Sequence, residues 1–234
     1  MPKRPLDRTR RKPSEQDDLA GILQTRLAQW FRSNRRSFPW RETKRSPYEI
    51  LIAEIMLQKT RAENIVPTYR KFIRKYPDFE SLSRADIQEI KRIVGVLGLS
   101  NMRARNLLRV GQEVVKNGRI PRNREQLLKI PGVGPYIANA FLLYAYNERL
   151  PVVDTNVRRL YGRIFSFESK KDPRRDKNVW IFAEKLLPIC NYKEFTWALM
   201  DFCASVCKPK NPLCRSCPIS DICDYGQQVL LMYR

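Results

Sequence analysis

Four of the six cysteines lie between residues 207 and 223, at a spacing that suits metal binding. Prolines between them favour a loop rather than a helix. Four thiolates at such spacing can hold either a [4Fe–4S] cluster or a structural zinc ion, and the spacing alone does not decide between them. The remaining two cysteines are expected to be core thiols. The clustered set is Cys207-x6-Cys214-x2-Cys217-x5-Cys223, and the other two are Cys190 and Cys203.

Two carboxylates are candidates for acid–base or electrostatic catalysis, because the chain contains no histidine. Glu54 lies in the apolar run 48–57, where apolar neighbours would keep its carboxyl protonated, as a general acid requires. A solvated position or an ion pair with an arginine would instead give it a structural role. Asp154 precedes an apolar-periodic segment, and taken alone it has the position of a helix N-cap.

A tight turn, Gly132-Val133-Gly134, joins two expected helices within residues 127–138. Glycines there let the backbone approach a phosphate closely, and the N-terminus of the next helix offers free N–H donors. Pro135 suits the first helical turn. Such a turn can also be an ordinary connection between helices. The net charge of +21 nevertheless indicates a polyanionic partner, and nucleic acid is the commonest one.

The elements that carry these residues are expected to be helices, and the absence of alternating strand patterns predicts an all-α fold. Apolar positions predict helices over residues 19–31, 48–57, 62–76, 86–94, 104–115, 123–130, 136–146, 157–164, 180–187 and 195–206. Residues 1–18 are predicted to be a basic, disordered arm. Without a membrane-length apolar run or a signal peptide, we expect an intracellular monomer, in the cytoplasm or nucleoid, or in the nucleus of a eukaryote.

Together these motifs resemble the helix-hairpin-helix superfamily of DNA glycosylases, in particular its endonuclease III and adenine glycosylase group. The resemblance covers nearly the whole chain after residue 20, and the x6, x2, x5 order of the cysteines is its most specific part. It implies a [4Fe–4S] cluster on Cys207, Cys214, Cys217 and Cys223. It also implies two helical domains with a cleft between them. Residues 46–151 would form a six-helix barrel that contains the hairpin, and residues 19–45 with 152–234 would form the domain with the cluster loop.

The resemblance also assigns roles at the site. Asp154 would stabilise the positive charge that develops on the sugar as the bond to the base breaks. Tyr136 stands where strand-cutting members carry a nucleophilic lysine, so the enzyme would be monofunctional and leave an abasic site. A tyrosine that merely packs on the hairpin is the alternative.

The same resemblance implies how damaged double-stranded DNA is bound. The hairpin residues Gly132, Val133 and Gly134 would grip the DNA backbone without reading its sequence. The run 53–60 resembles the matching segment of adenine and thymine-mismatch glycosylases and contains Glu54. There Gln58 and Lys59 would wedge the duplex and meet the opposite base during base flipping.

Two substrate classes compete within the group. The short chain, Tyr136 and the segment Asp154-Thr155-Asn156 favour the enzymes that remove thymine or uracil opposite guanine. Gln58 favours the adenine glycosylases, which act on adenine opposite guanine or 8-oxoguanine. A DNA-binding module without catalytic activity is a further alternative, and for such a module nothing would depend on Asp154.

Overall fold

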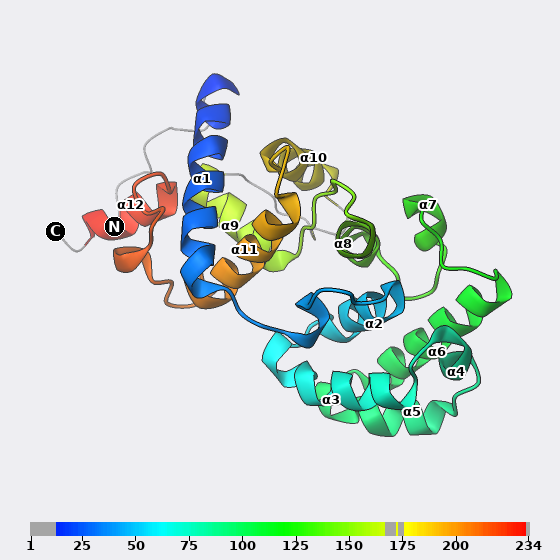
Figure 1. Cartoon of the computed structure of the whole chain (residues 1–234). Coiled ribbons are helices and arrows are strands. Elements are labelled where there is room, and N and C mark those ends of the chain that lie inside the picture. Colours follow the sequence, from blue (N-terminus) through cyan, green and yellow to red (C-terminus); the bar gives the residue numbers. More distant parts are fainter. Residues whose placement is uncertain (1–12, 167–171, 173–175, 233–234) are drawn as a thin grey trace. The chain divides into compact units, whose positions relative to one another are not determined.

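The computed structural model describes residues 13–166, 172 and 176–232, which are helical apart from turns and loops (Figure 1). No strand occurs in these ranges, so the predicted all-α fold is confirmed. No helix among the described residues is long and apolar enough to cross a membrane. The α-helices are α1 (Pro13–Asn34), α2 (Pro47–Leu57), α3 (Ala62–Lys75), α4 (Phe79–Ser83), α5 (Ile87–Val94), α6 (Ser100–Lys116), α7 (Arg124–Leu127), α8 (Pro135–Tyr146), α9 (Thr155–Phe165), α10 (Lys177–Leu186), α11 (Tyr192–Ser205) and α12 (Asp224–Leu231). Three short 3-10 helices, η1 (Pro39–Arg41), η2 (Gly95–Leu97) and η3 (Cys214–Ser216), complete the set.

The predicted arm is wrong for residues 13–18, because α1 begins at Pro13. Proline suits the first position of a helix, where its missing N–H costs no hydrogen bond, and Glu15 in the first turn complements the positive end of the helix dipole. Residues 1–12 lie outside the described residues.

The chain divides into two compact units, residues 1–36 with 151–234, and residues 37–150. We call the first the cysteine unit and the second the hairpin unit. The sequence placed the first boundary after residue 45, but Phe38 and Trp40 are buried in the core of the hairpin unit. Their rings stack with centroids 4.9 Å apart, and Trp40 meets Tyr69 edge-on at 5.3 Å. The chain therefore enters the hairpin unit before η1.

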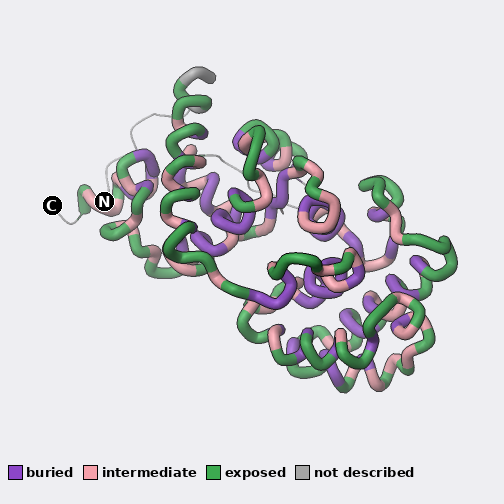
Figure 2. The backbone as a smooth tube through the Cα atoms, in the orientation of Figure 1, coloured by how far each residue is buried: buried purple, intermediate pink, exposed green. Residues whose placement is uncertain are grey.

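The hairpin unit is built around α2, which is buried along most of its length (Figure 2). Ser46 caps this helix, its side chain accepting from the Glu49 amide while the Glu49 carboxylate accepts from the Ser46 amide. The helix packs against α8, and α6 packs against α4 and α5. Because α2 is apolar nearly all round, a polar side chain on it is enclosed by the fold.

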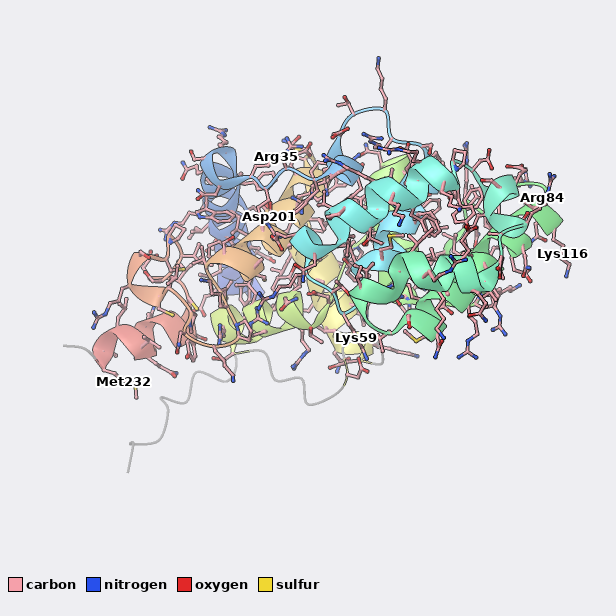
Figure 3. The ribbon with its side chains drawn as sticks, turned by 90° about the horizontal axis from the view of Figure 1, so that it is seen from below. Arg35, Lys59, Arg84, Lys116, Asp201 and Met232 are labelled. Carbon is pink, nitrogen blue, oxygen red and sulfur yellow. The ribbon has the colours of Figure 1, made fainter. Side chains whose placement is uncertain are left out.

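The cysteine unit is held together by α11, which packs against α1 and α9. Asp201 on α11 is fully buried and forms an ion pair with Arg36, whose Nη2 lies 2.7 Å from Asp201 Oδ1 (Asp201 is labelled in Figure 3). The Arg36 amide and Nε also donate to the same carboxylate. The end of α1 is thereby fixed to α11, and α9 is in turn packed against α12.

Candidate active site

Glu54 is buried on α2 with only 3% of its surface exposed, so the solvated alternative is excluded. Burial raises the pKa of its carboxyl to about 7, and the charge of Arg41 and a hydrogen bond from the Tyr136 hydroxyl act in the opposite direction. One carboxyl oxygen, Oε2, has no hydrogen-bond partner. A carboxyl in this setting keeps its proton close to neutral pH and can deliver it to a departing group.

Tyr136 lies in the first turn of α8, half-buried against the core of the hairpin unit. Packing of α8 on α2 brings its hydroxyl to the Glu54 carboxyl, to which it donates. Two residues that the sequence singled out separately thus form one hydrogen-bonded pair.

The hairpin turn has a backbone that requires glycine at one position. Gly132 has φ +90°, and a Cβ there would lie 2.5 Å from Cγ of Asn106 on α6. Gly134, the N-cap of α8, has φ −92° and open space where its Cβ would be. The turn is closed by the Val133 amide, which donates to the Ile130 carbonyl at 3.0 Å. The missing side chain of Gly132 therefore allows the turn to pack closely against α6. The missing side chain of Gly134 leaves the backbone at the N-terminus of α8 uncovered.

Gln58 and Lys59 follow α2 directly and lie beside the hairpin turn. The Gln58 Nε2 donates to the Gly132 carbonyl at 3.3 Å. Lys59, which is labelled in Figure 3, is exposed. Its backbone is left-handed, with φ +54°. The hairpin unit thus joins the segment predicted to meet the duplex to the turn predicted to grip its backbone.

Asp154 is the N-cap of α9, as its position in the sequence indicated. Its Oδ1 accepts from the amides of Asn156 and Val157, each at 2.8 Å, and its Oδ2 accepts from the Asn156 side chain at 2.7 Å. The carboxylate is half-buried and held in one orientation by these three bonds.

Three residues along α9 connect this carboxylate to the cysteine loop, and the sequence reasoning missed them. The Asn156 Oδ1 accepts from Arg159 at 2.8 Å, and Arg159 Nη2 donates to the Cys207 carbonyl at 2.8 Å. One turn on, Arg163 donates to the Lys208 carbonyl at 2.7 Å and to the Cys207 Sγ at 3.3 Å. Their spacing of three and four residues on one helix face was the available signal.

All four clustered cysteines line one small pocket. Among the described residues no three Cys, Asp or Glu side chains gather closely enough to hold a single metal ion. Burial raises the pKa of the Cys217 thiol to about 11 and that of Cys223 to about 12. Four thiols that line one pocket form the all-sulfur ligand set that a [4Fe–4S] cluster or a structural zinc ion requires.

The two remaining cysteines differ. Cys203 is buried on α11, as expected, and its thiol donates to the Asn156 carbonyl at 3.4 Å. Cys190 is exposed, so its assignment to the core is wrong. It lies in the turn between α10 and α11 next to Ile189, which is 89% exposed.

Comparison with known proteins places this geometry in a family. Residues 52–181 match the model of the HhH-GPD superfamily base excision DNA repair protein. The chain belongs to this superfamily. It is a DNA glycosylase, and the matched residues include Glu54, the hairpin and Asp154.

Individual relatives cover most of the glycosylase. The thymine/uracil-DNA glycosylase of Methanothermobacter thermautotrophicus is 38% identical over 209 residues, which are 88% of this chain and 94% of the relative. An adenine DNA glycosylase of Buchnera aphidicola is 32% identical over 204 residues, 86% of this chain but 57% of the relative. The solved structure of a thermostable thymine-DNA glycosylase superposes with a TM-score of 0.83 at 35% identity, covering 91% of this chain and 98% of that one.

The two hairpin glycines provide a matched test of the turn. Gly132→Ala should weaken DNA binding about tenfold and lower the free energy of unfolding by about 1–3 kcal/mol, because the new Cβ meets Asn106 and strains a positive φ. Gly134→Ala has room for its Cβ and should change stability much less. Urea titration and binding to a fluorescent duplex measure both effects. Equal losses of stability in the two variants would contradict this account of the turn.

Proposed function

We propose that this glycosylase removes thymine or uracil opposite guanine by hydrolysis and leaves the DNA strand intact. The observation that carries the chemistry is the buried Glu54 carboxyl, hydrogen-bonded to Tyr136. This pair provides a proton donor beside the hairpin, but it contains no amine that could attack the sugar. The choice of base is supported by the thymine/uracil relative, which matches over nearly its full length, whereas the adenine relative is matched over 57% of its length.

In this proposal Glu54 acts as the general acid. Its proton passes to the departing base as the bond between base and deoxyribose breaks, and the bonding electron pair leaves with the base. A carboxyl with a pKa of about 7 suits this step, because about half of it is protonated at neutral pH. Tyr136 would position the carboxyl through its hydrogen bond.

Asp154 would stabilise the sugar in the same reaction. Departure of the base leaves positive charge on the deoxyribose, and a carboxylate favours this charge electrostatically. The three hydrogen bonds that Asp154 accepts hold its oxygens in place in advance. Water then adds to the sugar carbon, and the proton that it releases restores the protonated Glu54 carboxyl through the solvent, which completes an abasic site.

Tyr136 accounts for the absence of strand cutting in the proposal. A lysine at this position would attack the sugar and form a Schiff base that leads to strand cleavage, and a phenol hydroxyl cannot form one. The enzyme would therefore stop at the abasic site.

Incubation with labelled duplexes that contain T:G, U:G, A:G or A:8-oxoguanine tests the proposal. We expect excision from the T:G and U:G duplexes, with strand breaks appearing only after alkali treatment. Breaks without alkali would contradict the role given to Tyr136. Product from the adenine duplexes alone would reassign the substrate, and tight binding without product on any duplex would indicate a binding module.

Asp154→Asn is the decisive variant in the same assay. Asparagine is as good an N-cap as aspartate, so α9 should remain capped while the negative charge is lost. We expect the excision rate to fall at least about 1000-fold, with the affinity for the mismatched duplex within about threefold of wild type. An unchanged rate would show that another carboxylate stabilises the sugar.

The pKa of Glu54 predicts the pH dependence of excision. As pH rises through about 7 the carboxyl loses its proton, so kcat/KM should fall about tenfold per pH unit above this value. Glu54→Gln should be slow and nearly independent of pH in this range. The exposed Glu63 on α3 provides the control, and Glu63→Gln should keep the wild-type profile. A descending limb that persists in Glu54→Gln would assign the acid elsewhere.

Stability gives a second readout for the same carboxyl. The folded protein binds this proton more tightly than the unfolded chain, whose carboxyl has a pKa of 4.5. Wild-type stability should therefore fall, relative to Glu54→Gln, as pH rises from about 4.5 to about 7.

We further propose that Cys207, Cys214, Cys217 and Cys223 hold a [4Fe–4S] cluster. The shared cavity and the all-thiol ligand set support this, and the cluster would supply structural cross-linking of the loop between α11 and α12. Arg163 and Arg159 already bind the carbonyls and thiol at the start of this loop.

Iron analysis of the purified protein tests the cluster. Wild type should be brown and contain about four iron atoms per chain. Cys217→Ser should lose most of the iron and unfold at a lower temperature, because the loop is no longer cross-linked. Cys190→Ser, at the exposed cysteine outside the set, should retain both. A colourless wild type with one zinc ion per chain would overturn the assignment.

A further inference from the structure

Arg103 on α6 is a buried cation that the proposed chemistry does not use. Only 2% of its surface is exposed, and burial lowers the pKa of its guanidinium. Within the described residues it contacts no carboxylate, and its Nε has no hydrogen-bond partner. Burial of an arginine without a counter-charge lowers the stability of the fold. The groups that Arg103 binds therefore indicate its role.

The guanidinium binds two separate loops. We call residues 58–60 the Lys59 loop and residues 97–99 the Leu99 loop. Toward the first, Arg103 Nη2 donates to the Gln58 carbonyl at 2.7 Å and to the Thr60 hydroxyl at 3.0 Å. Toward the second, Nη1 donates to the Leu97 carbonyl at 3.2 Å and to the Gly98 carbonyl. The planar fork of arginine suits such divergent acceptors, and a lysine ammonium does not.

Both loops hold strained backbone at exposed positions. Lys59 has φ +54° and Leu99 has φ +52°, left-handed conformations that are unfavourable for a residue with a side chain. Arg103 binds the residues on either side of Lys59, and the Thr60 hydroxyl also donates to the Leu97 carbonyl at 3.1 Å. The two loops are therefore cross-linked at their bases while the side chains of Lys59 and Leu99 stay exposed.

We propose that Arg103 is a positioning residue for duplex distortion, fixing the Lys59 loop and the Leu99 loop as one rigid element. The inference rests on the proposed function. Extrusion of a base requires the loss of its stacking and pairing in the duplex. A flexible loop that contacts the duplex would change its own conformation, and the DNA would stay undistorted. The Gln58 side chain, bonded to the Gly132 carbonyl, extends the same rigid element to the hairpin turn.

Arg103→Met and Thr60→Val test the inference, because each removes links between the loops by a different route. Thr60→Val leaves Arg103 in place and replaces only a half-buried hydroxyl, so it tests the cross-link even where Arg103→Met fails to fold. Arg103→Lys retains the charge but cannot bridge both loops. Arg105→Met is the matched control, since Arg105 is exposed on the same helix and its Nε bonds only the Asn101 carbonyl.

Each variant is compared by circular dichroism, by affinity for a T:G and a fully paired duplex, and by fluorescence of 2-aminopurine placed beside the mismatch. In Arg103→Lys and Thr60→Val, affinity for paired DNA should stay within about twofold. Preference for the mismatch should fall about tenfold, and the fluorescence rise on binding should be mostly lost.

Folded Arg103→Lys and Thr60→Val variants that match Arg105→Met in preference and fluorescence would overturn the inference. Equal loss of affinity for both duplexes would also overturn it, because that result indicates a general structural role. These measurements report DNA binding and distortion and do not require excision of the base. Absence of excision by wild type would therefore defeat the proposed function and leave the role of Arg103 to be decided separately.

Discussion

The enclosure of one carboxyl by an apolar helix is the constraint on which the chemistry that we propose for this glycosylase depends. Glu54 lies on α2, whose other side chains are nearly all buried, and the packing of α8 places Tyr136 against it. Removal from water raises the pKa of the carboxyl to about 7. On an amphipathic helix with this position facing solvent, the same side chain would be ionised at neutral pH and could not act as an acid. The acid strength of Glu54 is therefore set by the packing of the core around it.

In the cysteine unit a single helix connects the proposed electrostatic group to the proposed cluster. Asp154 caps α9, and Asn156 and Arg159 pass hydrogen bonds from its carboxylate to the Cys207 carbonyl. Arg163 contacts the same loop one turn later. A displacement of the cysteine loop would therefore reach Asp154 through this chain of hydrogen bonds. The cysteines would then affect the catalysis that we propose for Asp154 without taking part in bond breaking.

Local sequence patterns predicted those features that depend on a single helix or turn. The apolar run after Pro47 predicted α2, the position of Asp154 predicted an N-cap, and the glycines predicted the hairpin turn. Signals failed where a contact joins distant segments. Nothing near Phe38 indicates that its ring belongs to the hairpin unit, and nothing near Arg103 indicates the loops that it binds. Helix α4 was missed because five residues are too few to show a period.

Buried charges in this molecule fall into two kinds, and the difference separates structural from functional roles. Asp201 accepts from two guanidinium nitrogens of Arg36 at Oδ1 and from the Arg36 amide at Oδ2, so its charge is matched and it fixes α1 to α11. Glu54 keeps one oxygen without a partner, and Arg103 is satisfied only by carbonyls and a hydroxyl. A buried polar group with too few partners lowers the stability of the fold, and such groups are typical of functional positions. For Glu54 the function is to hold a proton near neutral pH, and for Arg103 it is to link two strained loops, which we propose distort the duplex. The hairpin unit, which carries both, thus gives up stability at the positions where it would act on the duplex.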